Sequence, residues 1–183
     1  MSKRLFVAVD VDEATRAQAA LVSAALRERI GPGTRASWVR PGQMHVTLLF
    51  FSAADPGYED RIRRALAQPI AEPVFAVSFQ GLRAFPERGS PRVVWLDVRE
   101  GAGPLRRVHE RLAERLHIEP GAFTPHLTVA RLKGRLPADR AAEIAEIPAS
   151  AGPSAIDRVT LYESCLSPAG PRHLRLADAL LQP

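Results

Sequence analysis

The segment His45-Val-Thr-Leu48 is repeated later in the chain as His126-Leu-Thr-Val129. In each copy an apolar residue follows the histidine and another follows the threonine, which is the alternation of a strand with one buried face. The histidine and the threonine of each copy must then share the opposite face. The repeat therefore predicts two equivalent strands, each presenting one imidazole and one hydroxyl group on the same side.

The elements predicted around the two copies follow one order in each half of the chain, namely strand, helix, strand, helix, strand. The first half is expected to hold strands near 4–9, 45–51 and 75–79, a helix that ends at 30 and a helix that stops at 69. The second half is expected to hold strands near 93–98, 125–131 and 156–166, a helix around 105–116 and a helix opened by Pro137, with a further strand at 172–176. The pattern predicts an α+β fold.

The first helix is predicted from a capping pair and from an apolar stripe. Asp10 followed by Glu13 has the spacing of a capping box. The stripe at helical spacing consists of Ala17, Leu21 and Ala25, with Val22 beside them. This face is expected to pack on the core.

The length of the chain favours one domain. With 183 residues, 46% of them hydrophobic, the chain can bury most of its apolar surface once but is short for two independent domains. We expect a single domain over 1–183, made of two pseudo-repeat halves at about 1–85 and 90–183. If a pseudo-twofold axis relates the halves, the two repeated strands face each other across one cleft.

Two imidazoles and two hydroxyl groups on opposite sides of a cleft suit a phosphate. Hydrolysis of a cyclic phosphodiester needs a base that takes a proton from water and an acid that protonates the leaving ribose oxygen. An unperturbed pKa of about 6.5 lets one imidazole be neutral while another is protonated near neutral pH. Hydroxyl groups and nearby cations can hold the phosphoryl oxygens. This scheme needs no metal ion and no cofactor.

Charge and composition limit the partners and the compartment. A net charge of +5 and a pI near 10.3 permit an anionic partner such as RNA, but nearly all the basic residues are arginine, which genome composition explains equally well. The single cysteine, Cys165, cannot form an internal disulfide, which favours a reducing compartment. No signal-peptide core or stretch of membrane-spanning length is visible. We expect a cytoplasmic monomer.

Beyond the repeat, five segments resemble the two-histidine (2H) phosphoesterase superfamily, and within it the bacterial RNA 2′,3′-cyclic phosphodiesterases, also called 2′-5′ RNA ligases or LigT-like proteins. The segments are Arg4-Leu-Phe-Val-Ala8, Trp38-Val39, His45-Val-Thr-Leu-Leu-Phe-Phe51, Phe123-Thr-Pro-His-Leu-Thr-Val-Ala-Arg131 and Ser167-Pro-Ala-Gly-Pro171. Together they extend over nearly the whole chain.

The resemblance implies a bilobal fold of two ferredoxin-like halves and the opening of an RNA-terminal 2′,3′-cyclic phosphate to a 2′-phosphomonoester. It also implies a reversible 2′-5′ ligation. By the same resemblance His45 is the proton donor and His126 the proton acceptor, with Thr47 and Thr128 on the phosphate. The residues themselves leave the acid and base roles open.

Three further positions are less clear. The resemblance also places Arg131 on the substrate, although strict alternation puts it on the face opposite His126, so this role requires the strand to end or twist. Ser52 stands where the family often has glycine, and His173 where it commonly has tyrosine. His109 falls beside the apolar stripe of its helix and is interpreted as a packing residue.

Two other readings of the sequence stay open. A ferredoxin-like module could bind RNA ends in the cleft without catalysing a reaction on them. Alternatively, an enzyme of the same superfamily could act on small cyclic nucleotides or on ADP-ribose cyclic phosphate.

Overall fold

The computed structural model describes residues 2–31, 33–86, 89–167 and 170–183. Pro168 and Ala169 of the segment Ser167–Pro171 lie outside the described residues. In chain order the elements are β1 (Lys3–Asp10), α1 (Glu13–Ile30), β2 (Ala36–Trp38), η1 (Pro41–Gln43), β3 (His45–Ala54), α2 (Pro56–Ala65), β4 (Ile70–Ala71), β5 (Phe75–Phe85), β6 (Val93–Glu100), α3 (Ala102–Leu116), β7 (His126–Leu132), α4 (Ala138–Glu143), η2 (Ile144–Glu146), β8 (Ser150–Ile156), β9 (Arg158–Cys165) and β10 (Arg172–Gln182).

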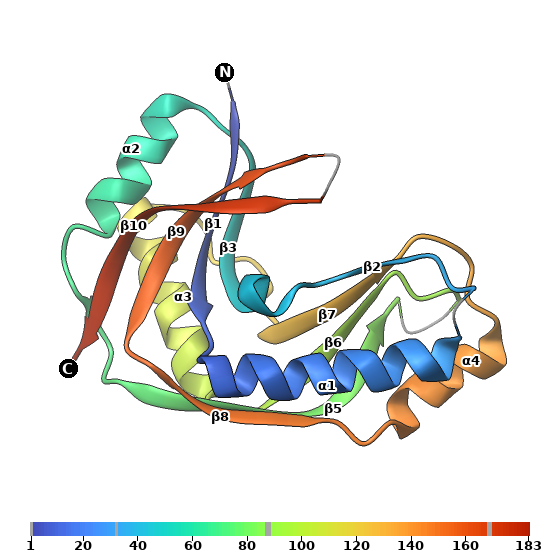
Figure 1. Ribbon diagram of the computed structural model, residues 1–183. Coiled ribbons are helices and arrows are strands. Elements are labelled where there is room, and N and C mark those ends of the chain that lie inside the picture. The colour runs from blue at the N-terminus through green and yellow to red at the C-terminus, as the bar shows by residue number, and fades with distance from the viewer. Residues whose placement is uncertain (1, 32, 87–88, 168–169) are drawn as a thin grey trace.

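The strands form two sheets that define two lobes (Figure 1). One sheet has the order β3-β1-β9-β10-β4, and with α2 and α3 it makes what we call the His45 lobe. The other has the order β2-β7-β6-β5-β8, and with α1 and α4 it makes the His126 lobe. The predicted two-lobed α+β fold is confirmed.

Each lobe takes strands from both halves of the chain. β9 and β10 come from the second half, yet they lie beside β1 in the His45 lobe. β5 comes from the first half and lies between β6 and β8 in the His126 lobe. Strands are therefore exchanged between the two halves of the chain, and neither lobe corresponds to one half of the sequence.

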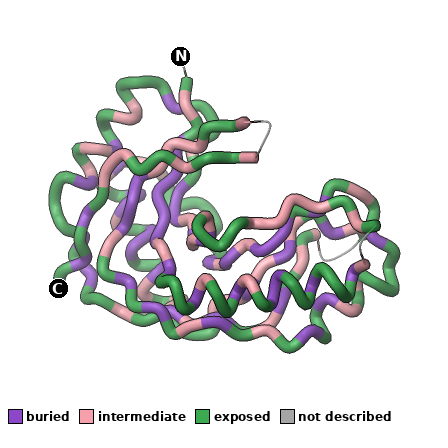
Figure 2. The backbone as a smooth tube through the Cα atoms, in the orientation of Figure 1, coloured by how far each residue is buried: buried purple, intermediate pink, exposed green. Residues whose placement is uncertain are grey.

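The strands nearest the centre of the molecule are buried (Figure 2). Every residue from Leu5 to Val9 of β1 is buried, and the inward side chains of both sheets belong to one apolar cluster together with those of α1 and α3. Burial of that surface is the main favourable contribution to folding. The two sheets are thus held against one another by a shared core, which fixes how β3 and β7 face each other.

The prediction of which face of α1 packs on the core is wrong. Leu21 of the predicted stripe is 73% exposed. The face that packs on the core is formed by Thr15, Ala19, Val22, Ser23, Leu26 and Ile30. Alanines occur on several sides of this helix, so its apolar asymmetry is weak and the sequence pattern does not select the buried side.

The predicted start of α1 is also displaced. Asp12, not Asp10, caps the helix, because its carboxylate accepts a hydrogen bond from the backbone N–H of Thr15 at 2.8 Å. Asp10 is the last residue of β1 and accepts a hydrogen bond from the hydroxyl of Tyr162 at 2.6 Å. The capping pair was therefore misassigned by two residues, and Asp10 belongs to the surroundings of the site.

The predicted strand at 156–166 corresponds to β9 (Arg158–Cys165), except that Ile156 at its start is the last residue of β8 in the other sheet. β8 ends at Ile156 in the His126 lobe, and β9 begins at Arg158 in the His45 lobe. Asp157 separates them where the chain crosses between the lobes. Asp157 and Arg158 are the consecutive charged residues that mark the break in the sequence.

Among the described residues, no helix is both long and apolar enough to span a membrane.

Candidate active site

The alternation predicted for both repeated segments is confirmed. In β3, Val46 and Leu48 are buried while His45 and Thr47 are partly exposed. In β7 the same pattern holds, with Leu127 and Val129 buried and His126 and Thr128 partly exposed. Each strand therefore turns one imidazole and one hydroxyl group away from the core.

A β-bulge follows each histidine-threonine pair at the same place. In the register of β3 with β1, Leu48 is skipped and has no partner residue on β1. In the register of β7 with β6, Val129 is skipped in the same way. A bulge shifts the alternation by one residue, so two consecutive residues point inward. As a result Phe50 and Arg131, which occupy equivalent positions, return to the face that carries the histidine. The bulge is therefore the strand irregularity that brings Arg131 to the same face as His126.

The two imidazole rings are oriented by the same kind of hydrogen bond. Nδ1 of His45 lies 2.7 Å from the carbonyl oxygen of Gln43, and Nδ1 of His126 lies 2.8 Å from that of Thr124. A carbonyl oxygen only accepts, so Nδ1 carries the hydrogen in both rings. In each ring Nε2 is then the atom left to exchange a proton with a ligand.

His45 is enclosed by other rings. Phe6 stacks on it with ring centroids 4.8 Å apart, and His173 meets it edge-on at 5.3 Å. Burial lowers the pKa of His45 from its ordinary value to about 4, against the opposing effect of the Gln43 carbonyl, and the nearby His173 and Arg131 lower it further. In the ligand-free protein this imidazole is therefore neutral near pH 7.

His126 lies beside open space. Its ring is 5.2 Å from that of Trp95, and it lines a cavity of about 590 Å³. The other lining residues are Arg83, Phe85, Val93, Trp95, Asp97, Thr124 and Arg131. The volume lies within the range of small-ligand sites, roughly 300–1,000 Å³.

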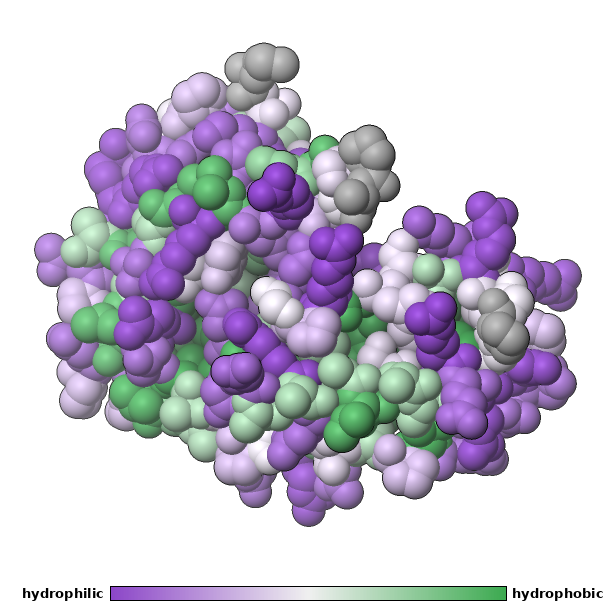
Figure 3. Space-filling view, viewed as in Figure 1, coloured by the Kyte–Doolittle hydropathy of each residue, from purple (hydrophilic) through white to green (hydrophobic). Residues whose placement is uncertain are grey.

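Arg131 connects the surroundings of the two histidines. It lines the cavity of His126, and its positive charge is near enough to His45 to lower the pKa of that ring. The two lobes also touch where β3 and β7 meet. The surface is hollowed between the lobes (Figure 3). The predicted residues His45, His126 and Arg131 therefore gather around one region between the sheets.

A sequence model of a known family matches this chain over residues 14–164. That family is the 2′-5′ RNA ligase superfamily, and the match spans both histidine-threonine strands. The chain belongs to this superfamily.

Relatives and solved structures in the superfamily match nearly the whole chain. A protein of Archaeoglobus fulgidus named RNA 2′,3′-cyclic phosphodiesterase is 38% identical over 178 residues, which is 92% of this chain and 94% of that protein. One of the same name from Thermotoga maritima is 32% identical, over 92% of this chain and 90% of its own. TT0787 of Thermus thermophilus is 28% identical with a TM-score of 0.72, covering 97% of each chain. LigT of E. coli, solved with ATP, has the same fold at 24% identity, with a TM-score of 0.76 and 100% of each chain covered.

Two aspartates of the site were missed by sequence reasoning. Asp10 lies opposite His45 in the β1–β3 pairing, and Asp97 lies opposite His126 in the β6–β7 pairing. Each lies in a strand, after a run of apolar residues, and that strand precedes the repeated segment by one α-helix. An alignment of the two halves on their strands would have matched them, but Asp10 was taken for a helix cap.

The tyrosine beside Asp10 completes the wall around His45. Tyr162 stacks on Phe6 with ring centroids 5.2 Å apart and donates its hydroxyl hydrogen to Asp10. Burial, and next the bond to Asp10, raise the pKa of Tyr162 well above its usual range. Tyr162 is thus a neutral donor that holds the carboxylate opposite His45.

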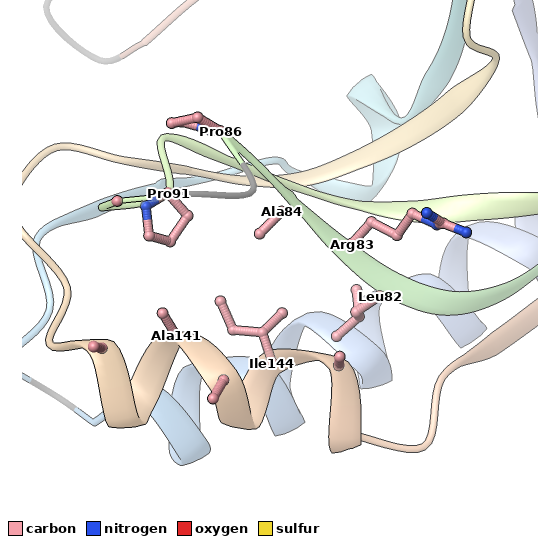
Figure 4. Close-up of a pocket in the computed structure, with 11 residues that line it drawn as sticks. Leu82, Arg83, Ala84, Pro86, Pro91, Ala141 and Ile144 are labelled. Carbon is pink, nitrogen blue, oxygen red and sulfur yellow. The ribbon is translucent and has the colours of Figure 1, made fainter.

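A separate cavity of about 640 Å³ lies between β5 and α4 (Figure 4). It is lined mainly by small and apolar side chains, and Arg83 extends away from it. Among its described lining residues there is no acid, histidine or nucleophile, so it has no groups for the predicted chemistry. In the part of the chain that the structure describes, no cluster of three or more His, Cys, Asp or Glu residues could hold a metal ion.

Proposed function

We propose that this protein hydrolyses an RNA-terminal 2′,3′-cyclic phosphate to a 2′-phosphomonoester by metal-independent acid and base catalysis with two histidines. The observation that carries the proposal is the pair of equally anchored imidazoles, His45 and His126, on matching bulged strands with Arg131 near both. The proposal is supported by relatives that match over 90% of the chain and are named RNA 2′,3′-cyclic phosphodiesterase.

The proposed reaction balances with the groups on the two strands. Water attacks the phosphorus and gives a proton to Nε2 of one histidine, the 3′-oxygen–phosphorus bond breaks, and Nε2–H of the other histidine protonates the 3′-oxygen. The phosphate remains on the 2′-oxygen. Thr47 and Thr128 donate hydrogen bonds to the non-bridging oxygens, and Arg131 offsets the negative charge of the transition state. With a 5′-hydroxyl group of RNA in place of water, the same step forms a 2′-5′ linkage, and the reverse of that ligation cleaves the linkage back to the cyclic phosphate with the histidine roles exchanged.

The role of His45 depends on what a bound phosphate does to it. We assign His45 as donor and His126 as acceptor. Since the pKa of His45 is about 4 in the ligand-free protein, a donor there must gain its proton as the anionic phosphate enters. An entering anion raises the pKa of a neighbouring imidazole, so binding supplies that change. If it does not, the neutral ring of His45 is the acceptor.

The test uses an oligonucleotide that ends in a 2′,3′-cyclic phosphate, incubated with protein in excess EDTA. We expect a 2′-phosphate product, and its loss in both His45→Ala and His126→Ala. A 3′-phosphate product, or loss of activity in EDTA, contradicts the proposal. Oligonucleotide binding that weakens with salt, without any product, assigns the cleft to a non-catalytic RNA-end-binding module instead.

The size of the substrate is open to a direct comparison. LigT has been solved with 3′-AMP, a mononucleotide. We propose an RNA end, tRNA-like or oligonucleotide, as the substrate of this chain. A higher kcat/KM for an oligonucleotide than for 2′,3′-cyclic AMP or ADP-ribose cyclic phosphate supports that choice, and the opposite order contradicts it. A monomeric state and a cytoplasmic location remain predictions.

A further inference from the structure

A buried histidine outside the proposed reacting groups lies between the two repeated segments. His109 belongs to α3, which packs against β3, and only 6% of its surface is exposed. Its predicted packing role is confirmed, since its ring stacks on that of Phe123 with centroids 4.5 Å apart and planes 12° apart. Packing does not account for its second contact.

That second contact is to the bulge of the first segment. Nδ1 of His109 lies 2.9 Å from the carbonyl oxygen of Leu48, the residue over which the β1–β3 pairing passes. Among the described strands, β3 lies at the edge of its sheet, so no strand is hydrogen-bonded to its outer side. Nδ1–H of His109 donates to a carbonyl group on the residue next to Thr47, and it thereby holds the bulge that follows the pair His45 and Thr47.

The ring of His109 stacks on Phe123, in the stretch that leads into the second repeated segment. Phe123 directly precedes Thr124, whose carbonyl oxygen accepts the hydrogen bond that orients His126. The stretch from Ile118 to Pro125 has no helix or strand of its own. The face of His109 is a fixed support for this stretch close to His126.

The polar contacts of His109 are limited to this one bond. Its Nε2 is buried, without a hydrogen-bond partner among the described residues. A phenylalanine would fill the same space and preserve the stacking, and would leave no uncompensated ring nitrogen. The hydrogen bond to Leu48 is therefore the contact that distinguishes histidine from a purely apolar residue here.

We propose that His109 is a positioning residue that joins the two repeated segments, with its Nδ1–H fixing the His45 strand and its ring face fixing the approach to His126. The inference on turnover rests on the proposed function, while the positioning itself does not. Because a shift of about 1 Å in a reacting group can cost roughly a hundredfold in rate, such a link affects kcat more than substrate binding.

Two substitutions separate the two contacts. His109→Phe keeps an aromatic face for Phe123 but removes the donor to Leu48. His109→Asn places an amide nitrogen at the same number of bonds from Cα as Nδ1, so it keeps the donor but removes the ring. Phe123→Leu removes the stacking from the other side. Leu105→Val, one turn earlier on the same helix, is the control for a loss of core volume without either contact.

The experiment records the imidazole 15N and 1H signals of His45 and His126 in the ligand-free variants, together with the melting temperature, kcat and KM. We expect His109→Phe to shift the His45 signals and His109→Asn to leave them near their original positions. Phe123→Leu and His109→Asn should shift the His126 signals. Leu105→Val should lower the melting temperature and leave both sets unchanged.

The rates then test the consequence of the positioning. We expect kcat to fall about tenfold or more in His109→Phe, with KM within roughly twofold, and to recover in part in His109→Asn. Histidine signals that move no more in the His109 variants than in Leu105→Val would overturn the inference. If the original protein shows no turnover, the proposed function fails, and the histidine signals still decide the role of His109.

Discussion

The two sides of the site share their local geometry but differ in what surrounds the imidazole. Both strands have the bulge, the Nδ1 hydrogen bond to a carbonyl two residues earlier, and an aspartate on the neighbouring strand. His45, however, is packed against Phe6 and His173, whereas His126 lines an open cavity. The repeat therefore fixes where the two rings point, and the neighbouring strands fix how far each ring is enclosed.

The position after each bulge shows a second difference. In β7 it holds Arg131, which faces the site, and in β3 it holds Phe50, which is 50% exposed and lies under the guanidinium of Arg4 at 5.4 Å. The scaffold offers two equivalent positions after the bulges, and the chain places arginine at one and phenylalanine at the other. If the site binds a phosphate as we propose, Arg131 is the cation at this position.

Removal of either imidazole should have the largest effect. His45→Ala and His126→Ala are each expected to lower kcat by about 10²–10⁴, because each removes an acid or a base from the reaction. The double variant should lose little more than the worse single variant, since the two groups act in one step. Product formation from a cyclic-phosphate oligonucleotide measures this. Activity near the original value in either single variant contradicts a reaction that needs both histidines.

Substitution of the residues that follow the two bulges should have the next largest effect on kcat. Arg131→Ala is expected to lower kcat by roughly 10²–10³, because the charge that builds on the phosphate loses its cation. Phe50→Ala is the matched control from the other lobe and should leave kcat near its original value. Loss of the positive charge of Arg131 should also raise the pKa of His45, which an NMR titration detects. Equal losses in the two variants would remove the distinction between the lobes.

The comparison of the lobes also shows what the sequence could predict. The faces of β3 and β7 follow from alternation over four residues, which is a local property, and were predicted correctly. Arg131 required the bulge, and no residue type in Thr128–Arg131 signals it. The partners of β9 and β10 were not predictable either, because an apolar strand pattern records burial but not the identity of the neighbouring strand.

Charge at the site was the least predictable feature. The low pKa of His45 arises first from burial, which only the assembled lobe provides, and then from His173 and Arg131, which are distant in sequence. Asp10 and Tyr162 are 152 positions apart in the chain and meet only because β9 pairs with β1. A repeated motif can therefore identify candidate reacting groups, whereas the proton affinity of His45 depends on contacts that form in the folded protein.

The pH dependence of kcat/KM should separate the two possible roles of His45. This parameter reports the free enzyme, in which the pKa of His45 is about 4. As a donor, His45 must be protonated, so its contribution to kcat/KM falls about tenfold per pH unit above that value. As an acceptor, it must be neutral, so kcat/KM instead falls as the pH drops below about 4. The falling part of the pH profile that disappears in His45→Gln is the part caused by the titration of His45.

The smallest expected effect is on stability in acid. The folded pKa of His45, about 4, lies below the unfolded value of about 6.5, so the unfolded chain takes up this proton first as the pH falls. The contribution of the neutral ring to the free energy of unfolding is thus complete above pH 6.5 and is lost between about 6.5 and 4. Melting temperatures of the original protein and of His45→Gln should therefore converge or cross as the pH is lowered through this range. A difference in melting temperature between the original protein and His45→Gln that stays constant over this pH range would contradict the assignment.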